Sequence, residues 1–258
     1  MDKKIKRIQK FYQTEKALVT SPFIEQTGKL NQELMATVFD KLCIKPDKKV
    51  IADIGCGTGL LAQYFSGVRF YVGLDLVFHP TLSELRNDLH QFIQADAHPN
   101  PLADESVDFL LCLDSFEHYP DQFKAAKEFY RVLKHDSSMF LSIPTYANVA
   151  GMVKKIMEDS GRYKKNTWAP FDFWQPEALE HFMTPKHVKD VFARAGFKEF
   201  KMVGYEKEVV VGLCPWVWHP KMPGKAAVLL QRIFRLFSRP LVSIWPQSSL
   251  HTFWKISK

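Results

Sequence analysis

The stretch of this sequence best suited to chemistry is a turn built on Gly55, Gly57 and Gly59. It follows the apolar run Val50–Ala52, which is long enough for a buried strand, and it leads into a segment with the pattern of a helix start. Glycine adopts positive φ angles and lets a ligand approach the backbone without meeting a Cβ atom. A strand, a glycine-rich turn and a helix N-terminus together predict a ligand-binding loop.

The ligand of this loop is constrained by the glycine spacing and by the acid that precedes it. A dinucleotide-binding loop follows G-x-G-x-x-G/A, whereas the sixth position here is Leu60. Asp53, at the end of the expected strand, would repel a pyrophosphate on the loop, but it can pair with a cation. The pattern therefore favours a positively charged ligand and argues against a dinucleotide-dependent oxidoreductase.

Two further acids follow apolar runs that read as strands. Asp75 lies in the run 70–76, sixteen residues beyond Gly59. A carboxylate at the end of the second strand can accept two hydrogen bonds from a ribose diol, which is how nucleotide cofactors are held. Asp96 follows the next expected strand, residues 92–95. Together with the glycine turn, Asp75 indicates a nucleoside-containing cofactor.

The pattern D-x-G-x-G-x-G after a strand resembles motif I of the class I S-adenosylmethionine-dependent methyltransferases. The resemblance extends from about residue 50 to residue 197. Residues 101–108, PLADESVD, are similar to the family run P-F-x-D-x-S-F-D. Residues 128–144 are similar to E-x-x-R-V-L-K-P-G-G-x-L-x-x-x-x-P, except that residues 135–138, HDSS, replace the usual Pro-Gly-Gly turn. Residues 114–121, DSFEHYPD, resemble the small-molecule, quinone-biosynthesis-like type 11 branch.

The resemblance implies an α/β fold, with a Rossmann-like, doubly wound sheet of seven strands that is mostly parallel and has an antiparallel last strand. Helices would cover both faces. We expect one methyltransferase domain over residues 1–258, interrupted by two insertions. The core would comprise residues 28–144, 184–211 and 250–258; the insertions would be a substrate cap at about 145–183 and a basic amphipathic helical segment at about 212–249.

The resemblance also implies S-adenosyl-L-methionine as cofactor and S-adenosylhomocysteine as product. In the family, the glycine loop holds the amino-acid end of the cofactor, whose ammonium and sulfonium are positive, and Asp53 fits that charge directly or through water. Asp96 and Ala97 match the position that meets the adenine amino group, and N-terminal aromatic residues close over the site. The predicted cofactor contacts are Asp53, Gly55, Cys56, Gly57, Gly59, Asp75, Leu76, Asp96, Ala97, Leu113, Asp114 and Tyr12.

His118 is the candidate catalytic residue, because it follows the fourth expected strand and could act as a base for a hydroxyl or orient a substrate. The alternative is a structural histidine that caps the next helix. Methyl transfer needs alignment and exclusion of water, and it needs a base only when the acceptor starts protonated. The cap supplies aromatic residues that either contact substrate or form a small local core: Tyr146, Trp168, Phe171 and Trp174.

Hydrophobic periodicity and turn signals predict the elements that position these residues. Helices are expected over residues 3–17, 28–43, 60–65, 120–133, 184–195 and 225–237. Strands are expected over residues 50–52, 70–76, 92–95, 107–113, 139–143, 197–203 and 250–258. The sixth strand could be prolonged to Val211.

The helix expected over 225–239 has two contrasting faces. Its apolar residues are Ala226, Leu229, Leu230, Ile233, Phe234 and Phe237; its basic residues are Lys225, Arg232, Arg235 and Arg239. Trp216, Trp218 and Trp245 flank it. Such a helix is typical of peripheral membrane contact, and the pattern also fits a helix packed on its own domain with a solvated basic face.

Composition narrows the classes of partner. The net charge is +7, from 35 Lys and Arg against 28 Asp and Glu, which is compatible with nucleic acid, an anionic membrane or an acidic substrate. The four cysteines form no C-x-x-C pair, so we expect no metal site and no disulfide framework. We therefore expect a cytoplasmic protein. It would be peripheral to the membrane if the basic helix binds the membrane surface. The basic N-terminus lacks the apolar segment of a secretory signal.

Three functions remain to be weighed. The leading one is methylation, on oxygen or carbon, of a small-molecule or lipidic acceptor. The second is a nucleic-acid methyltransferase, which the positive charge favours. Against it, the fourth strand ends L-D-S-F instead of the N/D-P-P-Y/F of enzymes that methylate base amino groups. The third is a non-catalytic protein that binds the cofactor.

Overall fold

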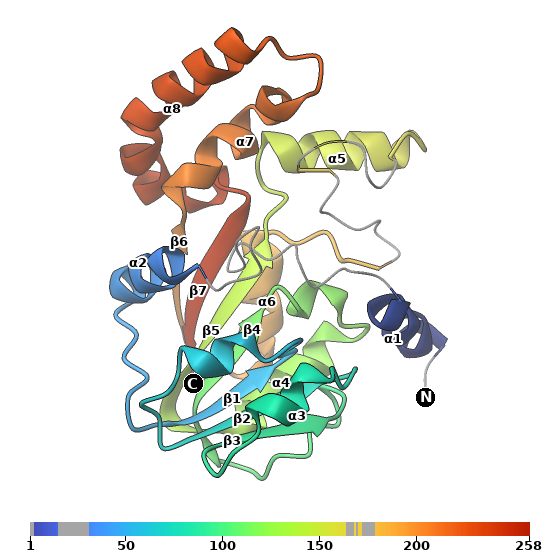
Figure 1. Ribbon diagram of the computed structural model, residues 1–258, viewed down its shortest axis with the longest axis vertical. Helices are drawn as coiled ribbons and strands as arrows, with labels where there is room; N and C mark the ends of the chain where they lie inside the picture. The colour runs from blue at the N-terminus through green and yellow to red at the C-terminus, as the bar shows by residue number, and fades with distance from the viewer. Residues whose placement is uncertain (1–2, 15–30, 164–167, 169, 172–178) are drawn as a thin grey trace. The chain divides into compact units, whose positions relative to one another are not determined.

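The computed structural model describes residues 3–14, 31–163, 168, 170–171 and 179–258. Its centre is a sheet of seven strands in the order β3-β2-β1-β4-β5-β7-β6 (Figure 1). The strands are β1 (Val50–Ile54), β2 (Phe70–Asp75), β3 (His90–Gln94), β4 (Val107–Leu113), β5 (Leu133–Pro144), β6 (Glu199–Gly204) and β7 (His251–Ser257).

Most of the sheet is parallel. β1 pairs in parallel with β2 and β4, β2 with β3, and β4 with β5. The last strand, β7, runs the other way. Near its start the Thr145 amide at the end of β5 donates to the Leu250 carbonyl over 2.8 Å. Near its end the Lys258 amide donates to Ser137, early in β5, over 2.9 Å. The predicted seven-stranded sheet with an antiparallel last strand is confirmed.

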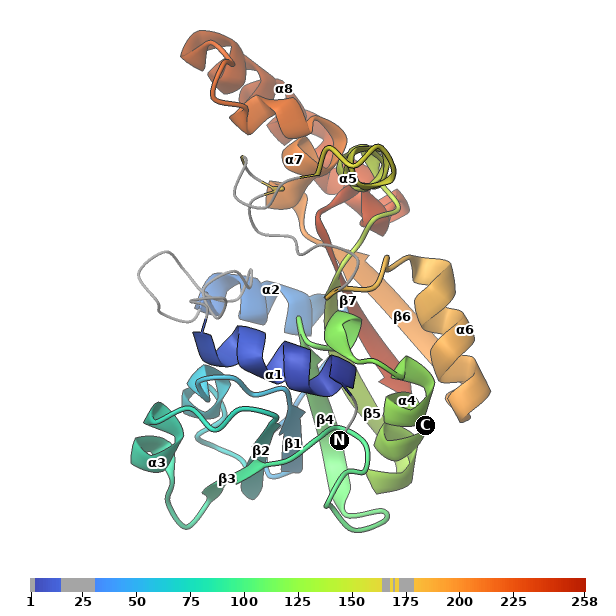
Figure 2. The ribbon, with the colours of Figure 1, turned by 90° about the vertical axis from the view of Figure 1, so that its right-hand side faces the viewer.

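Helices cover both faces of the sheet, and Figure 2 shows α2 (Gln32–Leu42) and α4 (Gln122–Val132) on opposite sides of it. Phe39 of α2 packs on Phe140 of β5, with ring centroids 5.0 Å apart. Both helices begin at capping side chains, because Asn31 accepts from the Leu34 amide and Asp121 from the Lys124 amide. The remaining helices are α1 (Lys3–Thr14), α3 (Thr81–Leu85), α5 (Val149–Asp159), α6 (Pro185–Ala195), α7 (Val209–Leu213) and α8 (Gly224–Ile244).

Two predicted elements differ in type from the structure. The α-helix expected over 60–65 is a single 3-10 turn, η2 (Leu60–Gln63), because the chain must enter β2 at Phe70 and the connection is too short for a longer helix. The prolongation of the sixth strand to Val211 is also wrong: residues 206–213 form the 3-10 turn η4 (Glu206–Glu208) and α7. A short apolar run fits a buried helix as well as a buried strand.

Other predicted boundaries move. β5 begins at Leu133 instead of Met139, so the turn-like segment 135–138 lies within it, with Asp136 at a φ of 57°. α8 continues past the predicted end at Phe237 to Ile244 and contains Pro240. Local sequence patterns predict the ends of helices and strands less well than they predict their presence.

The chain divides into two compact units. The first comprises residues 1–142, 189–201 and 254–258, and it contains β1 to β4 with the glycine turn. The second comprises residues 143–188 and 202–253, and it contains α5, α7 and α8. The organisation as one domain with two insertions stays a prediction. No helix among the described residues combines the length and apolar character needed to cross a bilayer.

Candidate functional site

Asp53 is a buried carboxylate at the carboxyl end of β1, with only 1% of its surface exposed. Its Oδ2 atom accepts a hydrogen bond from the Tyr71 hydroxyl on the neighbouring strand. Its other oxygen, Oδ1, is buried and accepts no hydrogen bond from the described residues. Burial raises the pKa of Asp53 from 3.8 to about 7; the Tyr71 hydrogen bond opposes this change and the nearby Asp75 carboxylate adds to it. The oxygen is therefore suited to a cationic partner.

The glycine turn is held in a defined shape against Asp75. Its three glycines have φ angles of 83°, 54° and 75°, a region that glycine adopts more easily than residues with a Cβ atom. The Gly57 amide donates to Asp75 Oδ2 over 2.8 Å, and the Val77 amide donates to Oδ1 over 2.9 Å. Burial raises the pKa of Asp75, while these hydrogen bonds oppose that change. A carboxylate has about four acceptor positions, so each oxygen retains capacity for a ligand hydroxyl.

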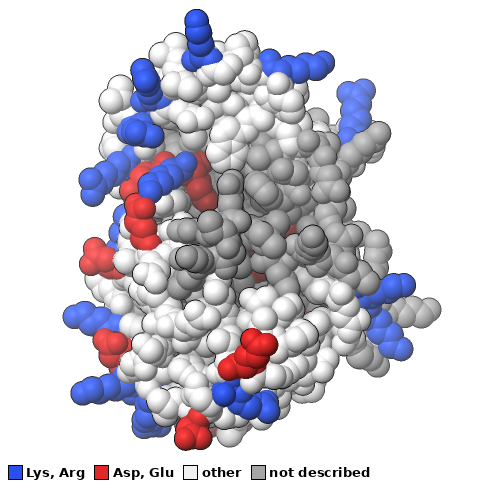
Figure 3. Space-filling view, in the orientation of Figure 1, with Lys and Arg blue, Asp and Glu red and all other residues white. Residues whose placement is uncertain are grey.

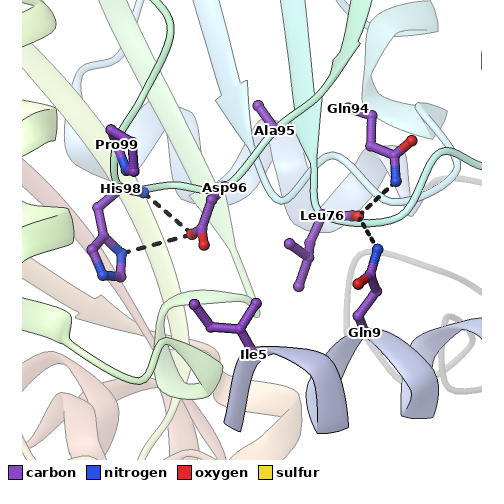
Figure 4. Close-up of a pocket in the computed structure, with 8 residues that line it drawn as sticks. All are labelled: Ile5, Gln9, Leu76, Gln94, Ala95, Asp96, His98 and Pro99. Carbon is purple, nitrogen blue, oxygen red and sulfur yellow. Dashed lines mark hydrogen bonds and ion pairs between the residues drawn. The ribbon is translucent and has the colours of Figure 1, made fainter. Parts of the chain in front are cut away.

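A pocket of about 510 Å³ lies at the ends of β2 and β3 (Figure 4). Ile5 and Gln9 of α1 form one wall, and the side-chain amide of Gln9 donates a hydrogen bond to the Leu76 carbonyl over 3.4 Å. Asp96 is on the opposite wall, where its Oδ1 accepts from the His98 amide over 3.3 Å. The pocket is lined by Ile5, Gln9, Leu76, Gln94, Ala95, Asp96, His98 and Pro99. The neighbouring Ala97 is buried.

The end of β4 approaches the glycine turn from the other side. A Cβ atom added at Gly55 would lie 2.1 Å from the Ser115 hydroxyl, so only glycine permits this approach. Asp114 follows Leu113 with a φ of 45°, and its Oδ1 accepts from the Ser142 hydroxyl over 2.7 Å. The two sequence motifs, one after β1 and one after β4, are thus brought side by side.

His118 closes the short 3-10 turn η3 (Phe116–His118) that follows β4. Its ring meets the ring of Tyr12 from α1 edge to face, with centroids 5.6 Å apart. Its Nε2 atom lies 3.8 Å from Glu117 Oε1. Tyr12 and His118, which are far apart in sequence, therefore meet at the carboxyl edge of the sheet.

Three of the predicted substrate residues, Tyr146, Trp168 and Phe171, are described by the structure and lie in the second unit. Tyr146 and Phe171 are fully buried there, Tyr146 stacks on Phe182, and Trp168 packs edge to face on Phe171 with ring centroids 4.7 Å apart. Trp174 lies outside the described residues. These contacts form a local aromatic core, and a substrate role for these residues stays a prediction.

The sequence analysis did not predict some of the residues that form the site. Tyr71 meets Asp53 only because β1 and β2 pair in the register that puts Gly73 opposite Asp53. Gln9 and Ile5 reach the pocket because α1 folds back over the end of β2. The strand pairing could have suggested Tyr71, since it is polar within an apolar strand, whereas nothing local marked the two residues of α1.

The sheet order, the glycine turn after β1 and the acid after β2 define the class I S-adenosylmethionine-dependent methyltransferase fold. Residues 52–141, about a third of the chain, match the family model described as a methyltransferase domain. S-adenosylmethionine is the cofactor of the class.

Relatives agree with this assignment. The chain is 30% identical over 127 residues to an uncharacterised methyltransferase-like protein of Schizosaccharomyces pombe, covering 46% of this chain and 48% of that protein. It is 27% identical over 108 residues to a ubiquinone biosynthesis O-methyltransferase of Neisseria meningitidis, covering 36% and 43%. The chain thus spans less than half the length of these relatives.

Among solved structures, the fold resembles a Haemonchus contortus phosphoethanolamine N-methyltransferase in complex with S-adenosylmethionine. The TM-score is 0.60 at 13% identity, covering 97% of this chain and 59% of that one. At this level of identity the comparison shows the fold alone.

Proposed function

We propose that this protein transfers the methyl group of S-adenosylmethionine to oxygen or carbon of a small-molecule or lipidic acceptor. The observation that carries the proposal is the buried Asp53 oxygen that no described residue satisfies, at the end of β1 beside the glycine turn. A buried carboxylate whose pKa is raised to about 7 is stabilised by a cation, and the cofactor carries two positive groups.

The residues present fit the cofactor. When bound, S-adenosylmethionine supplies an electrophilic methyl group on a sulfonium. In our proposal Asp53 neutralises the positive charge at the amino-acid end, and Asp75 accepts hydrogen bonds from the ribose hydroxyls. The pocket against α1 takes the adenine ring, with Leu76 against its face and Asp96 accepting from its amino group. Ala97, Leu113 and Asp114 complete the proposed contacts.

His118 is the residue we propose to receive a proton from an acceptor hydroxyl. Its place after β4 and beside Tyr12 puts an imidazole at the edge where the acceptor would meet the methyl group. Tyr12 would exclude water from that edge, which favours alignment of the acceptor and methyl group over hydrolysis. A carbon or thiol acceptor that starts ionised would not need this base.

The acceptor class is proposed from the family context. The Neisseria relative is named for O-methylation in ubiquinone biosynthesis, and this supports an aromatic or quinone-like ring with an apolar tail. The cysteines near the site do not favour attack on a pyrimidine ring, because burial raises the pKa of both the Cys56 and Cys112 thiols well above the usual value.

The test uses S-adenosylmethionine labelled in its methyl group, with the protein and an extract of cells that lack it. Label in the organic fraction supports the proposal, whereas label only in RNA or protein contradicts the acceptor class.

The variant His118→Gln distinguishes a catalytic from a structural role of His118. If His118 is the base, kcat falls by about two to four orders of magnitude while the Kd for the cofactor is unchanged. An unaltered kcat would assign His118 a structural role.

A further inference from the structure

The second unit exposes a continuous apolar strip along α8. The strip consists of residues at the spacing i, i+4, i+7, i+8 and i+15, so they share one side of the helix: Leu229, Ile233, Leu236, Phe237 and Ile244. Leu236 is 83% exposed and Ile244 is 85% exposed. Ser238 and Val242, the buried residues of α8, lie on the opposite side of the helix. An amphipathic helix in a globular protein normally turns its apolar residues to the core. In α8, Leu230 and Phe234 are half-buried, whereas the strip faces outward.

A row of basic residues borders the strip. Lys225, Arg232 and Arg239 recur every seven residues, and Arg235 lies beside them. From residue 209 to residue 254 the chain contains five Lys and Arg and no Asp or Glu. Figure 3 shows Lys and Arg side chains among uncharged atoms over α8. None of these basic side chains forms an ion pair with an acid in the described part of the chain. Among the described residues, the charge of this surface is therefore not balanced by acidic partners.

Two exposed tryptophans precede the helix. Trp216 and Trp218 lie in the 3-10 turn η5 (Pro215–Trp218), and each exposes nearly half of its surface. Tryptophan favours the level of lipid headgroups, since its ring is apolar and its N–H can be hydrated. Exposed tryptophans, an apolar strip and a basic row are thus combined in one continuous segment of the chain.

We propose that α8 and η5 dock on the surface of an anionic lipid bilayer. The apolar strip would enter the boundary between headgroups and acyl chains, and the basic row would contact lipid phosphates. Charge complementarity selects this occupant: a second copy would bring the four like charges of one basic row against the four of the other, and a nucleic acid would satisfy the basic row but leave the apolar strip in water. The inference does not depend on methyl transfer.

The experiment is co-sedimentation of the full chain with vesicles. One set contains phosphatidylcholine alone, and the other an equal mixture of phosphatidylcholine and phosphatidylglycerol. We expect binding to the mixed vesicles, with partition reduced roughly a hundredfold in the triple variant R232Q/R235Q/R239Q, since each basic residue near such a surface contributes about fivefold. Leu236→Asp should reduce partition at least about tenfold, because it places a charge in the strip. Circular dichroism verifies that each variant is folded.

Matched control variants make the same kinds of substitution in the first unit, away from α8. K45Q/K189Q/K198Q removes three exposed lysines of the first unit, and Leu89→Asp alters an exposed leucine there. Both should bind like the unchanged protein. Equal loss in the control and α8 variants, or no binding to the mixed vesicles, would overturn the proposal. So would a dimer in sedimentation velocity without lipid that Leu236→Asp dissolves, because a second copy would then cover the strip.

Discussion

Asp53 destabilises the folded protein when no cation is bound to it. Its pKa of about 7, against 3.8 as the ordinary value, means that the ionised carboxylate is disfavoured in the fold. Each pKa unit is worth 1.36 kcal/mol, so this amounts to roughly 4 kcal/mol above pH 7. A cation bound beside the carboxylate would remove this penalty.

Asp53→Asn should therefore stabilise the protein at alkaline pH. An Asp whose pKa is raised in the fold contributes no penalty below about pH 4, and the free energy of unfolding falls as the pH rises from there to about 7. The neutral amide removes this loss but leaves an N–H unpaired, at a cost of about 1–3 kcal/mol, so a net gain of about 2 kcal/mol is expected near pH 8. Urea unfolding at about pH 8 and pH 4 measures it.

The control is Asp88→Asn, which neutralises an exposed aspartate of the first unit. It should change the free energy of unfolding by less than about 0.5 kcal/mol at both pH values. An Asp53→Asn variant that is less stable at pH 8 than at pH 4, relative to the unchanged protein, would show that Asp53 already has a compensating partner.

The affinity for S-adenosylmethionine should fall below about pH 7. Below that pH, Asp53 is protonated in the free protein, so pairing with a cation must release a proton. The Kd would then rise by up to about tenfold for each pH unit. Calorimetry at about pH 6 and pH 8, in buffers of different ionisation enthalpy, measures both the Kd and the released proton.

S-adenosylhomocysteine refines this measurement, because it retains the ammonium and lacks the sulfonium charge. The same pH dependence for both compounds assigns Asp53 to the ammonium. A Kd for S-adenosylmethionine that is equal at the two pH values would contradict any pairing with Asp53.

At the scale of elements, β2 supports the glycine turn through a residue with no side chain. Gly73 lies opposite Asp53 in the parallel register, and a Cβ atom there would lie 2.7 Å from the Phe92 ring and 2.9 Å from Cys56 Sγ. The turn is thus packed directly on the strand, and its shape depends on the absence of that atom.

Gly73→Val should weaken cofactor binding through the turn. Displacement of Cys56 would disturb the amides on either side of it, and overpacking costs about 1–3 kcal/mol of stability. We expect a Kd at least about tenfold higher, measured by calorimetry on the folded variant. Gly67→Ala is the control, since the nearest atom to its added Cβ is at an ordinary 3.8 Å; it should leave the Kd unchanged. An unchanged Kd in Gly73→Val would show that cofactor binding does not depend on the shape of the glycine turn.

At the scale of the whole molecule, the division into two units predicts where the cofactor acts. All proposed contacts with S-adenosylmethionine lie in the first unit, which contains β1 to β4. A ligand at a hundredfold excess over its Kd stabilises the state that binds it by about 2.7 kcal/mol. If the two units open independently, only the unit that binds the ligand is stabilised against opening.

Hydrogen exchange should therefore slow in β1, β2 and β3 when the cofactor is added, and stay unchanged in α7 and α8. Mass spectrometry of peptides from each unit measures the difference, with Asp53→Ala as a variant that should show no slowing anywhere. Slowing of equal size in α8 would mean that the two units open together.

The sequence by itself determined the class of the protein. The apolar runs of the strands, the positive-φ glycines and the acids after β1 and β2 are local features, because backbone conformation and strand burial depend on near neighbours. The positions of the strands were predicted on this basis, whereas the antiparallel direction of the last strand was implied by the resemblance to class I methyltransferases. The short connection after Gly59 and the run from Val209 misled the prediction, since helix and strand compete on such short stretches.

Only the tertiary structure decided which residues surround the site and which remain exposed. The Tyr71 contact with Asp53, the wall that Ile5 and Gln9 add to the pocket, and the outward face of α8 all join or separate residues distant in the chain. Local sequence specifies that α8 is amphipathic. Whether its apolar side is buried depends on the volume that the rest of the fold leaves beside it, and this is a property of packing.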